Sequence, residues 1–141
     1  MSKPNVFDTS VYIHALRRGD ADILRKKQSE TFPLWLSAVV MEELYIGASD
    51  RKLLKIFTKF ENDFTKINRL LVPNHSDWSI AGQLLNKIRE KYGLDKVGKA
   101  RLTNDAVLAM SVARTGMKLL TVNSKDFRLI SEFREFDWEI V

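Results

Sequence analysis

The stretch that decides the fold lies near the N-terminus and reads Asn5-Val6-Phe7-Asp8-Thr9-Ser10-Val11-Tyr12-Ile13. Its first part, residues 5–8, is short and mainly apolar, and it predicts a β-strand that ends at Asp8. Apolar residues then resume at helical spacing through Leu16, which predicts a helix after a tight turn. A strand followed directly by a helix is the repeating unit of an α/β fold.

The same order of strand, turn and helix repeats along the chain. Residues 34–36 form a second apolar run, and Ser37 is a candidate N-cap for a helix that passes through Glu43 to Gly47. By the same spacing rules, helices are predicted at residues 53–64, 80–93 and 104–114, the last capped by Thr103, and strands at residues 70–72, 119–122 and 138–141. This alternation predicts an α/β fold in which helices cover both faces of a mainly parallel sheet of four or five strands.

Length and composition fit one compact domain over residues 1–141. Hydrophobic residues make up 45% of the chain and charged residues 29%, which is ordinary for a globular protein. No apolar run reaches the roughly 18 residues of a membrane span, and the N-terminus is polar. We therefore expect a cytoplasmic protein that does not use a membrane as its partner.

The chain has no cysteine and only two histidines, His14 and His75. This composition excludes disulfides, thiolate zinc sites and cysteine nucleophiles, and it leaves oxygen as the main ligand for any metal. The formal net charge of +5 and the pI near 9.5 permit attraction to a polyanion such as nucleic acid. A solvated basic surface would account equally well for the same charge.

Three acidic residues fall where such a sheet would place a ligand. Asp8 directly follows the first predicted strand, and the crevice of an open parallel sheet lies beyond the carboxyl ends of its strands. Glu43 shares a helix face with Val40, and Asp105 shares one with Leu108 in the predicted first turn of its helix. A carboxylate on an inward face is costly unless it is paired, protonated or bound to a cation.

Each of these acids also has a purely structural interpretation. Asp8 alone would be a helix cap or a turn residue. Glu43 could form a buried ion pair with an arginine, and Asp105 could interact with the dipole of its helix. The case for a functional site therefore rests on the three acids coming together.

Polar residues also follow the strand predicted at residues 119–122, where Asn123 and Asp126 compete for a fourth place in the cluster. Either residue could instead belong to a turn. Acids from separate segments, with almost no histidine, match a site for Mg²⁺ or Mn²⁺, which prefer carboxylate oxygens and water. Such a cation would polarise a phosphodiester and lower the pKa of a bound water, so that hydroxide forms near neutral pH.

Four segments in this order resemble the PIN domain, and especially the VapC-like toxins: Val6-Phe7-Asp8-Thr9-Ser10, Glu43-Leu44-Tyr45-Ile46-Gly47, Asn104-Asp105-Ala106-Val107-Leu108-Ala109 and Thr121-Val122-Asn123-Ser124-Lys125-Asp126-Phe127. Together they span nearly the whole chain. The resemblance implies a three-layer α/β/α fold, a homodimer, and cleavage of single-stranded or looped RNA that depends on Mg²⁺ or Mn²⁺. It also implies a cognate antitoxin whose C-terminal segment wraps the toxin and blocks its acidic groove.

The resemblance also assigns roles to individual residues. It implies that the catalytic metal is held by Asp8, Glu43 and Asp105, and that polar groups at the site come from Thr9, Ser10 and Asn104. Where many relatives have an acid, this chain has Asn123, so Asp126 becomes the candidate fourth catalytic acid. The alternative is that Asn123 coordinates the metal through its amide oxygen or through a water.

Basic residues precede Asp105, and the nearest to it are Lys99 and Arg101. We expect these two side chains to hold RNA phosphates beside the metal. The plain alternative is a solvated helix face and loop, which is the commoner fate of such basic runs.

Other functions fit some of the same residues. A phosphatase could use Asp8 as its nucleophile, but Ser10 stands where a haloacid-dehalogenase-type phosphatase would have a second Asp. A phosphorylatable receiver module needs an acid pair after the first strand, and only Asp8 stands there. Within the PIN resemblance, a housekeeping RNA-processing nuclease and a non-catalytic binding module with a degenerate metal site are the alternatives to a toxin.

Overall fold

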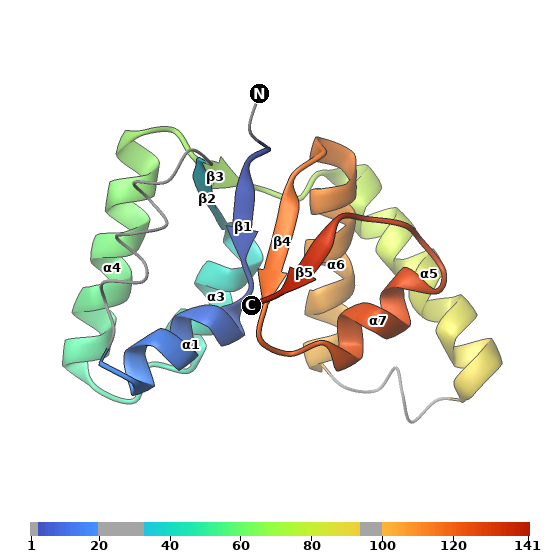
Figure 1. Ribbon diagram of the computed structural model, residues 1–141, viewed down its shortest axis with the longest axis horizontal. Helices are drawn as coiled ribbons and strands as arrows, with labels where there is room; N and C mark the ends of the chain where they lie inside the picture. Colours follow the sequence, from blue (N-terminus) through green and yellow to red (C-terminus); the bar gives the residue numbers. More distant parts are fainter. Residues whose placement is uncertain (1–2, 20–32, 94–99) are drawn as a thin grey trace.

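Five parallel strands form the centre of the computed structural model, which describes residues 3–19, 33–93 and 100–141 (Figure 1). Their order across the sheet is β3-β2-β1-β4-β5, and each neighbouring pair is parallel. The predicted parallel sheet is thus confirmed. The strands are β1 (Asn5–Phe7), β2 (Leu34–Ser37), β3 (Leu70–Leu71), β4 (Lys118–Thr121) and β5 (Trp138–Ile140).

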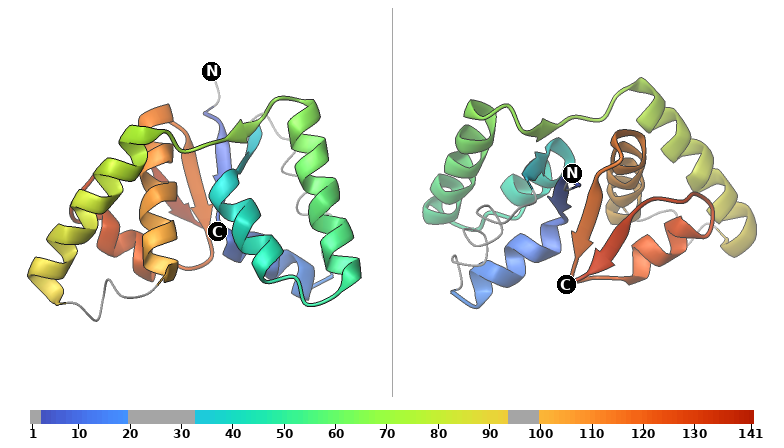
Figure 2. Two further views of the ribbon diagram at one scale, coloured as in Figure 1. Left: turned by 180° about the vertical axis from the view of Figure 1, so that it is seen from behind. Right: turned by 45° about the horizontal axis from the view of Figure 1, so that its top comes forward.

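Six helices of the described residues surround the sheet. They are α1 (Thr9–Arg17), α3 (Ala38–Ile46), α4 (Arg51–Lys66), α5 (His75–Tyr92), α6 (Ala100–Thr115) and α7 (Lys125–Ser131). Seen from the front and from behind, α1 and α7 cover one face of the sheet, α3, α5 and α6 cover the other, and α4 stands at the β2–β3 side (Figures 1 and 2). This arrangement confirms the three-layer α/β/α fold. Within the described ranges, no helix combines the length and the apolar character needed to cross a membrane.

The strand order reverses beside β1, and this reversal creates the place for a site. The chain runs from β1 outward through β2 to β3, and then returns to add β4 and β5 on the other side of β1. The carboxyl ends of β1 and β4 therefore lie together, and the Asp8 amide donates to the Leu120 carbonyl at 2.9 Å. Ligands of open α/β sheets bind at such a reversal of strand order.

Local sequence explains how several elements begin and end. The side chain of Ser37 accepts a hydrogen bond from the Val39 amide at 3.1 Å, which confirms Ser37 as the N-cap of α3. The predicted end of α5 at Gly93 is also confirmed, because this glycine adopts a φ of 96° that other residues rarely reach. Gly116 ends α6 in the same way, with a φ of 68°.

Two predictions around the acidic segments were wrong or incomplete. Helix α6 begins at Ala100, so Thr103 lies inside the helix instead of capping it, and Asp105 lies beyond the first turn. The residues before Thr103 include Arg101 and Leu102, which are good helix formers and extend the helix by about one turn. Helix α7 was not predicted, because a helix of seven residues is too short for its apolar spacing to stand out.

A buried carboxylate ties α5 to α6. Asp77 is 1% exposed, and it completes a capping box at the start of α5 by accepting from the Asn74 amide at 3.0 Å. Its two oxygens also accept from Arg114 Nε near the end of α6, both at 3.0 Å. This pair connects the helix that carries Asp105 to its neighbour in the same layer.

We expect Asp77→Ala to lower the free energy of unfolding by about 2–3 kcal/mol, because it removes a helix cap and leaves the Arg114 guanidinium without its buried partner. Urea denaturation of the two proteins measures the difference. Asp63→Ala is the control, because it removes an exposed ion pair with Lys59 and should cost less than about 1 kcal/mol. Equal losses in the two variants would contradict a structural role for Asp77.

Candidate functional site

Three carboxylates from distant parts of the chain meet at the carboxyl ends of β1 and β4. Asp8 follows β1, Glu43 lies on α3 and Asp105 lies on α6. One carboxylate oxygen from each of these residues lies within 4.8 Å of the corresponding oxygens of the other two. Asp8 and Asp105 are each only 4% exposed, so the cluster is largely shielded from water. The structure thus brings together the three acids that the sequence singled out.

Two hydroxyl groups hold the Asp8 side chain in place. Ser10 Oγ donates to Asp8 Oδ2 at 2.7 Å, and Thr121 Oγ1 donates to the same oxygen at 2.8 Å. Asp8 occupies the N-cap position of α1, yet its side chain makes no capping hydrogen bond. The carboxylate is therefore turned toward the acidic cluster and away from the helix end, so the interpretation as a simple cap does not describe it.

Glu43 is half-buried and accepts a hydrogen bond from Thr9 Oγ1 at 2.8 Å. Burial raises the pKa of the Glu43 carboxyl, and the negative charge of Asp8 adds to this, while the Thr9 hydrogen bond and the Arg101 charge act in the opposite direction. The alternative of a buried ion pair with an arginine is not observed, since the salt bridges found in the described part of the chain do not include Glu43.

Asp105 carries the largest electrostatic cost in the cluster. Burial raises the pKa of its carboxyl to about 9, and the charge of Asp8, a hydrogen bond with Asp126 and the charges of Asp126 and Glu43 add to the effect. Without a cation, Asp105 is consequently protonated at neutral pH. A bound cation would favour the ionised form and release that proton.

The donor set fits a hard divalent cation. Converging carboxylate oxygens are the ligands that Mg²⁺ and Mn²⁺ prefer, and no nitrogen or sulfur ligand belongs to the cluster found in the described residues. The raised pKa of Asp105 points the same way, because a positive charge would offset both the burial and the neighbouring negative charges that raise it.

Asp126 and Asn123 occupy different environments beside the cluster. Asp126, in the first turn of α7, forms a hydrogen bond with Asp105 and contributes to its raised pKa. The Asn123 amide oxygen accepts from the Lys125 amide at 3.3 Å, as a turn residue would. Asp126 therefore interacts with Asp105 while Asn123 is engaged in the turn, and Asp126 lies outside the group of three.

The cluster opens into a hollow of about 640 Å³, which we call the acidic groove. Thr9, Ser10, Arg101 and Asn104 all line it, as expected from the sequence, whereas Lys99 lies outside the described residues. The groove is lined by Asp8, Thr9, Ser10, Ile13, His14, Arg17, Glu43, Ile46, Gly47, Arg101, Asn104, Asp105 and Val122.

Sequence reasoning missed two contributors to this site. Thr121 was placed in a strand and in a family-like segment but given no role at the site, yet its hydroxyl contacts Asp8; its place at the carboxyl end of a strand was the available signal. His14 was given no role at the site, but it is half-buried and lines the acidic groove. It follows Ser10 by four residues, so the two share a face of α1.

The buried Asp105 predicts how the stability of the metal-free protein changes with pH. Its pKa of about 9 in the folded state exceeds the ~3.9 of an unfolded Asp, so the folded state binds one more proton between these two values. The free energy of unfolding should therefore fall as the pH rises through this window, by on the order of a few kcal/mol. Urea unfolding in EDTA at about pH 5.5 and about pH 8.5 measures the fall.

The variant Asp105→Asn provides the matched comparison, because an amide of the same shape cannot ionise. The free energy of unfolding of this variant should change much less between the two pH values. At the higher pH the variant should be more stable than the wild type. Added Mg²⁺ should stabilise the wild type at that pH and the variant much less. The same pH dependence in both proteins would rule out Asp105 as the responsible group.

Comparisons with known proteins agree with this fold. The fold is similar to that of a chain in the DNA-bound VapBC structure from Salmonella typhimurium, with a TM-score of 0.71, 17% identity, and coverage of 99% of this chain and 98% of that one. For VapBC-1 from nontypeable Haemophilus influenzae the TM-score is 0.67 at 19% identity, with 96% of each chain covered.

A third similar structure is VapBC-5 from Mycobacterium tuberculosis, described as a member of the VapBC family of toxin–antitoxin systems. Its TM-score is 0.55 at 18% identity, over 99% of this chain and 98% of that one. A comparison with curated protein sequences found no significant match. The sequence matches the PIN domain over residues 6–132, which is most of its length, and the chain therefore belongs to the PIN domain family.

Proposed function

We propose that this protein is a metal-dependent endoribonuclease and the toxin of a toxin–antitoxin pair. The observation that carries the proposal is the convergence of Asp8, Glu43 and Asp105 within 4.8 Å, at the reversal of the strand order. PIN domains are generally nucleases, and the similar VapBC structures support assignment to the toxin class.

In this proposal the three acids hold Mg²⁺ or Mn²⁺. The cation, when bound, supplies Lewis-acid activation of water and of the phosphodiester. Ser10 and Thr121 fix the orientation of Asp8, and Thr9 does the same for Glu43, so the carboxylate oxygens face the cation in a set geometry. Because these hydrogen bonds already exist without the cation, little rearrangement is needed when it binds.

Asp126 completes the site on the side of Asp105. Its hydrogen bond with Asp105 places it next to the cluster, where a carboxylate can orient a water or accept its proton. Asn123, whose side chain accepts a backbone hydrogen bond in the adjacent turn, then has a structural role. The roles of Thr9, Ser10 and Asn104 follow from their positions on the wall of the acidic groove.

Arg101 is the candidate contact to the RNA backbone. It is exposed and lines the acidic groove one helical turn before Asp105. A guanidinium at this distance can hold a phosphate next to the one that is cleaved, and it also offsets the negative charge of the acids.

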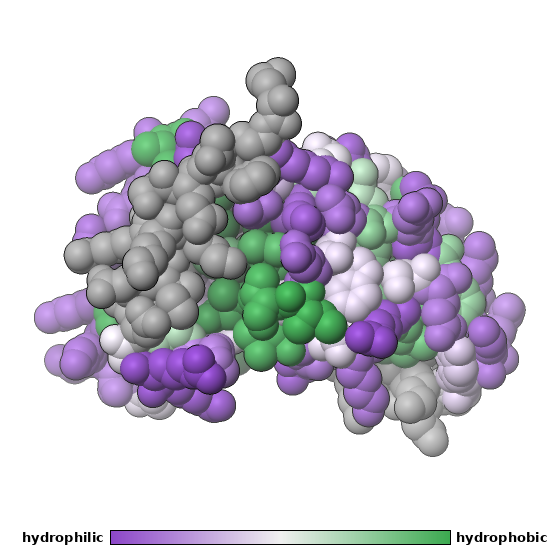
Figure 3. Space-filling view, viewed as in Figure 1, coloured by the Kyte–Doolittle hydropathy of each residue, from purple (hydrophilic) through white to green (hydrophobic). Residues whose placement is uncertain are grey.

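An antitoxin is the second partner in the proposal. An apolar patch stands out on the face seen in Figure 3, near the C-terminus, where Ile140 and Val141 are 46% and 48% exposed. The Val141 amide donates to the Thr121 carbonyl, so this patch adjoins Val122, which is itself exposed and lines the acidic groove. An apolar surface beside an active-site groove fits a protein segment that covers both.

The family resemblance leads us to expect a cytoplasmic homodimer as well.

Cleavage of a mixed RNA pool by the purified protein is the direct test. We expect the wild type to cleave RNA with Mg²⁺ or Mn²⁺ and not with EDTA. The cleavage rate should be at least 100-fold lower in Asp8→Asn and in Asp105→Asn, because each variant loses a metal-binding carboxylate. Thr121→Val should lose roughly 10-fold, since it removes a hydroxyl that orients Asp8 and bonds to the Asn123 backbone but removes no metal-binding carboxylate. Asp126→Asn should reduce the rate more than Asn123→Ala.

Asp63→Asn on α4 is the control, because it changes an exposed acid outside the acidic groove. Thermal unfolding shows whether each variant is folded. If the wild type binds Mg²⁺ by calorimetry but cuts no RNA, the nuclease proposal fails and a metal-binding module remains. If it binds neither metal nor RNA, the site is structural.

The contribution of Arg101 should appear in the salt dependence of RNA binding. We expect Arg101→Ala to weaken binding and to reduce the slope of log K against log salt concentration by about 0.7, the value for one phosphate contact on a single strand. Fluorescence anisotropy at several salt concentrations measures the slope.

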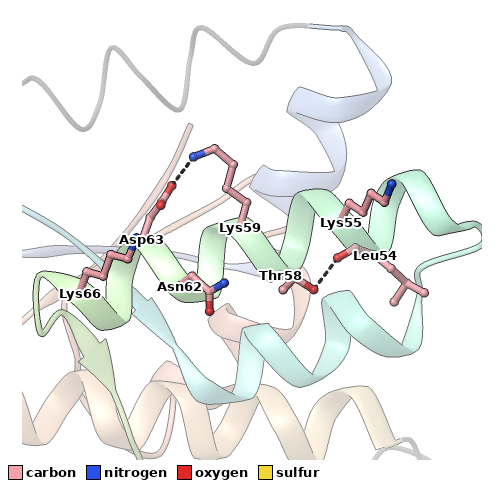
Figure 4. Close-up of a pocket in the computed structure, with 7 residues that line it drawn as sticks. All are labelled: Leu54, Lys55, Thr58, Lys59, Asn62, Asp63 and Lys66. Atoms are coloured by element: carbon pink, nitrogen blue, oxygen red, sulfur yellow. Dashed lines mark hydrogen bonds and ion pairs between the residues drawn. The ribbon is translucent and has the colours of Figure 1, made fainter.

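Lys55 on α4 provides the matched control for the loss of one positive charge. Figure 4 shows Lys55, Lys59 and Lys66 along one side of this helix, with Lys59 paired to Asp63. This surface is separate from the acidic groove. Lys55→Ala should therefore leave the slope unchanged, and an equal effect of both variants would show that only net charge matters.

A further inference from the structure

A second hollow of about 470 Å³ lies on the other side of Arg101, and we call it the Tyr92 hollow. Its walls come from the end of α5, the start of α6, and α7 with the turn before it. Arg101 lines both this hollow and the acidic groove. Asp126, which hydrogen bonds to Asp105, also lines the Tyr92 hollow. The two hollows are thus neighbours. Arg101 lines both of them, and Asp105 lines the acidic groove while its partner Asp126 lines the Tyr92 hollow.

The aromatic ring in this hollow is held in place while it stays accessible. Tyr92 is 40% exposed, and its hydroxyl donates to Glu132 Oε2 at 2.6 Å. The ring packs edge-on against Phe133, with centroids 6.5 Å apart, and Lys91 Nζ lies 5.1 Å from its centroid. A ring that is fixed at several points and still exposed is ready to stack on a ligand at little entropic cost.

The charges around the hollow argue for a neutral ligand group. The lining residues Arg101 and Lys125 are matched by Asp126 and Glu132, and Lys91 beside the hollow is itself paired with Glu132 at 3.5 Å. A phosphate site would instead show an excess of positive charge. Leu129 adds apolar surface, and the charged groups offer both donors and acceptors of hydrogen bonds. A flat aromatic group with polar edges is the ligand that matches this combination.

We propose that the Tyr92 hollow binds a nucleobase of the RNA strand whose backbone passes over Arg101 into the acidic groove. Tyr92 stacks on the base, and the polar groups of the hollow contact its edge, as in other sites that recognise single-stranded RNA. This inference rests on the proposed ribonuclease function, and it makes the hollow a determinant of which nucleotide lies beside the cleaved phosphate.

The test is equilibrium binding to single-stranded RNA in an Asp8→Asn background, which prevents cleavage and leaves the hollow and Arg101 intact. Two fluorescent probes of equal length are compared by anisotropy in Mg²⁺: a mixed-sequence oligoribonucleotide and a ribose-phosphate oligomer that has no bases. We expect Tyr92→Ala to weaken binding of the first probe about tenfold, as loss of one stacked base would. Binding of the probe without bases should change less than twofold.

Two variants control for the fold and for aromatic residues in general. Tyr92→Phe keeps the ring and loses only the bond to Glu132, so its affinity should stay within twofold of the parent. Trp78→Ala removes an aromatic side chain that is 57% exposed on α5 but lines neither hollow, and it should have no effect.

The proposal is overturned if Tyr92→Ala binds the first probe like its parent, or if it weakens both probes equally. It is also overturned if Tyr92→Ala changes the oligomeric state in size-exclusion chromatography, because the hollow would then be a protein contact. If one of these outcomes is found and the wild type still cleaves RNA in a metal-dependent way, only the proposed base site is wrong. If the Asp8→Asn parent binds no RNA and the wild type cuts none, both the base site and the ribonuclease function are wrong.

Discussion

The burial of acidic side chains next to one another is the constraint on which the rest of this structure depends. Asp8 and Asp105 are almost fully buried, Glu43 is half-buried, and their oxygens lie within 4.8 Å of one another. Burial is the main cause of the raised pKa of Asp105, and the neighbouring charges of Asp8, Asp126 and Glu43 raise it further, so ionising all the acids together destabilises the folded state. The hydroxyls of Thr9, Ser10 and Thr121 offset part of the repulsion, and they do so at Asp8 and Glu43.

The remainder of the fold supplies rigidity around this unfavourable centre. The central strands are buried, and the parallel pairing of β1 with both β2 and β4 fixes the backbone on either side of Asp8. Helix α6 is anchored at its far end by Arg114, which pairs with the buried Asp77. Because the acids sit on elements held by many independent contacts, they cannot move apart to relieve their repulsion.

The sequence predicted the parts of this arrangement that depend on periodicity. Short apolar runs located all five strands, and helical spacing placed Glu43 and Asp105 on inward faces. The start of α6 was misplaced because Thr103 resembles a cap, while good helix formers before it continue the helix. The distinction between Asp126 and Asn123 depends on how α7 packs against α6, a tertiary contact that leaves no periodic pattern. Thr121 was missed because its contact with Asp8 joins residues far apart in the sequence, although its place at the end of β4 was an available signal.

Helix α6 carries Arg101 and Asp105 four residues apart. In an α-helix this separation is a rise of about 6 Å with both side chains on nearly the same face. The helix therefore fixes the spacing between the Arg101 guanidinium and the Asp105 carboxyl in the acid cluster. In the proposed function, this fixed spacing would hold a phosphate contacted by Arg101 in register with the acids, whatever residues the surrounding loops carry.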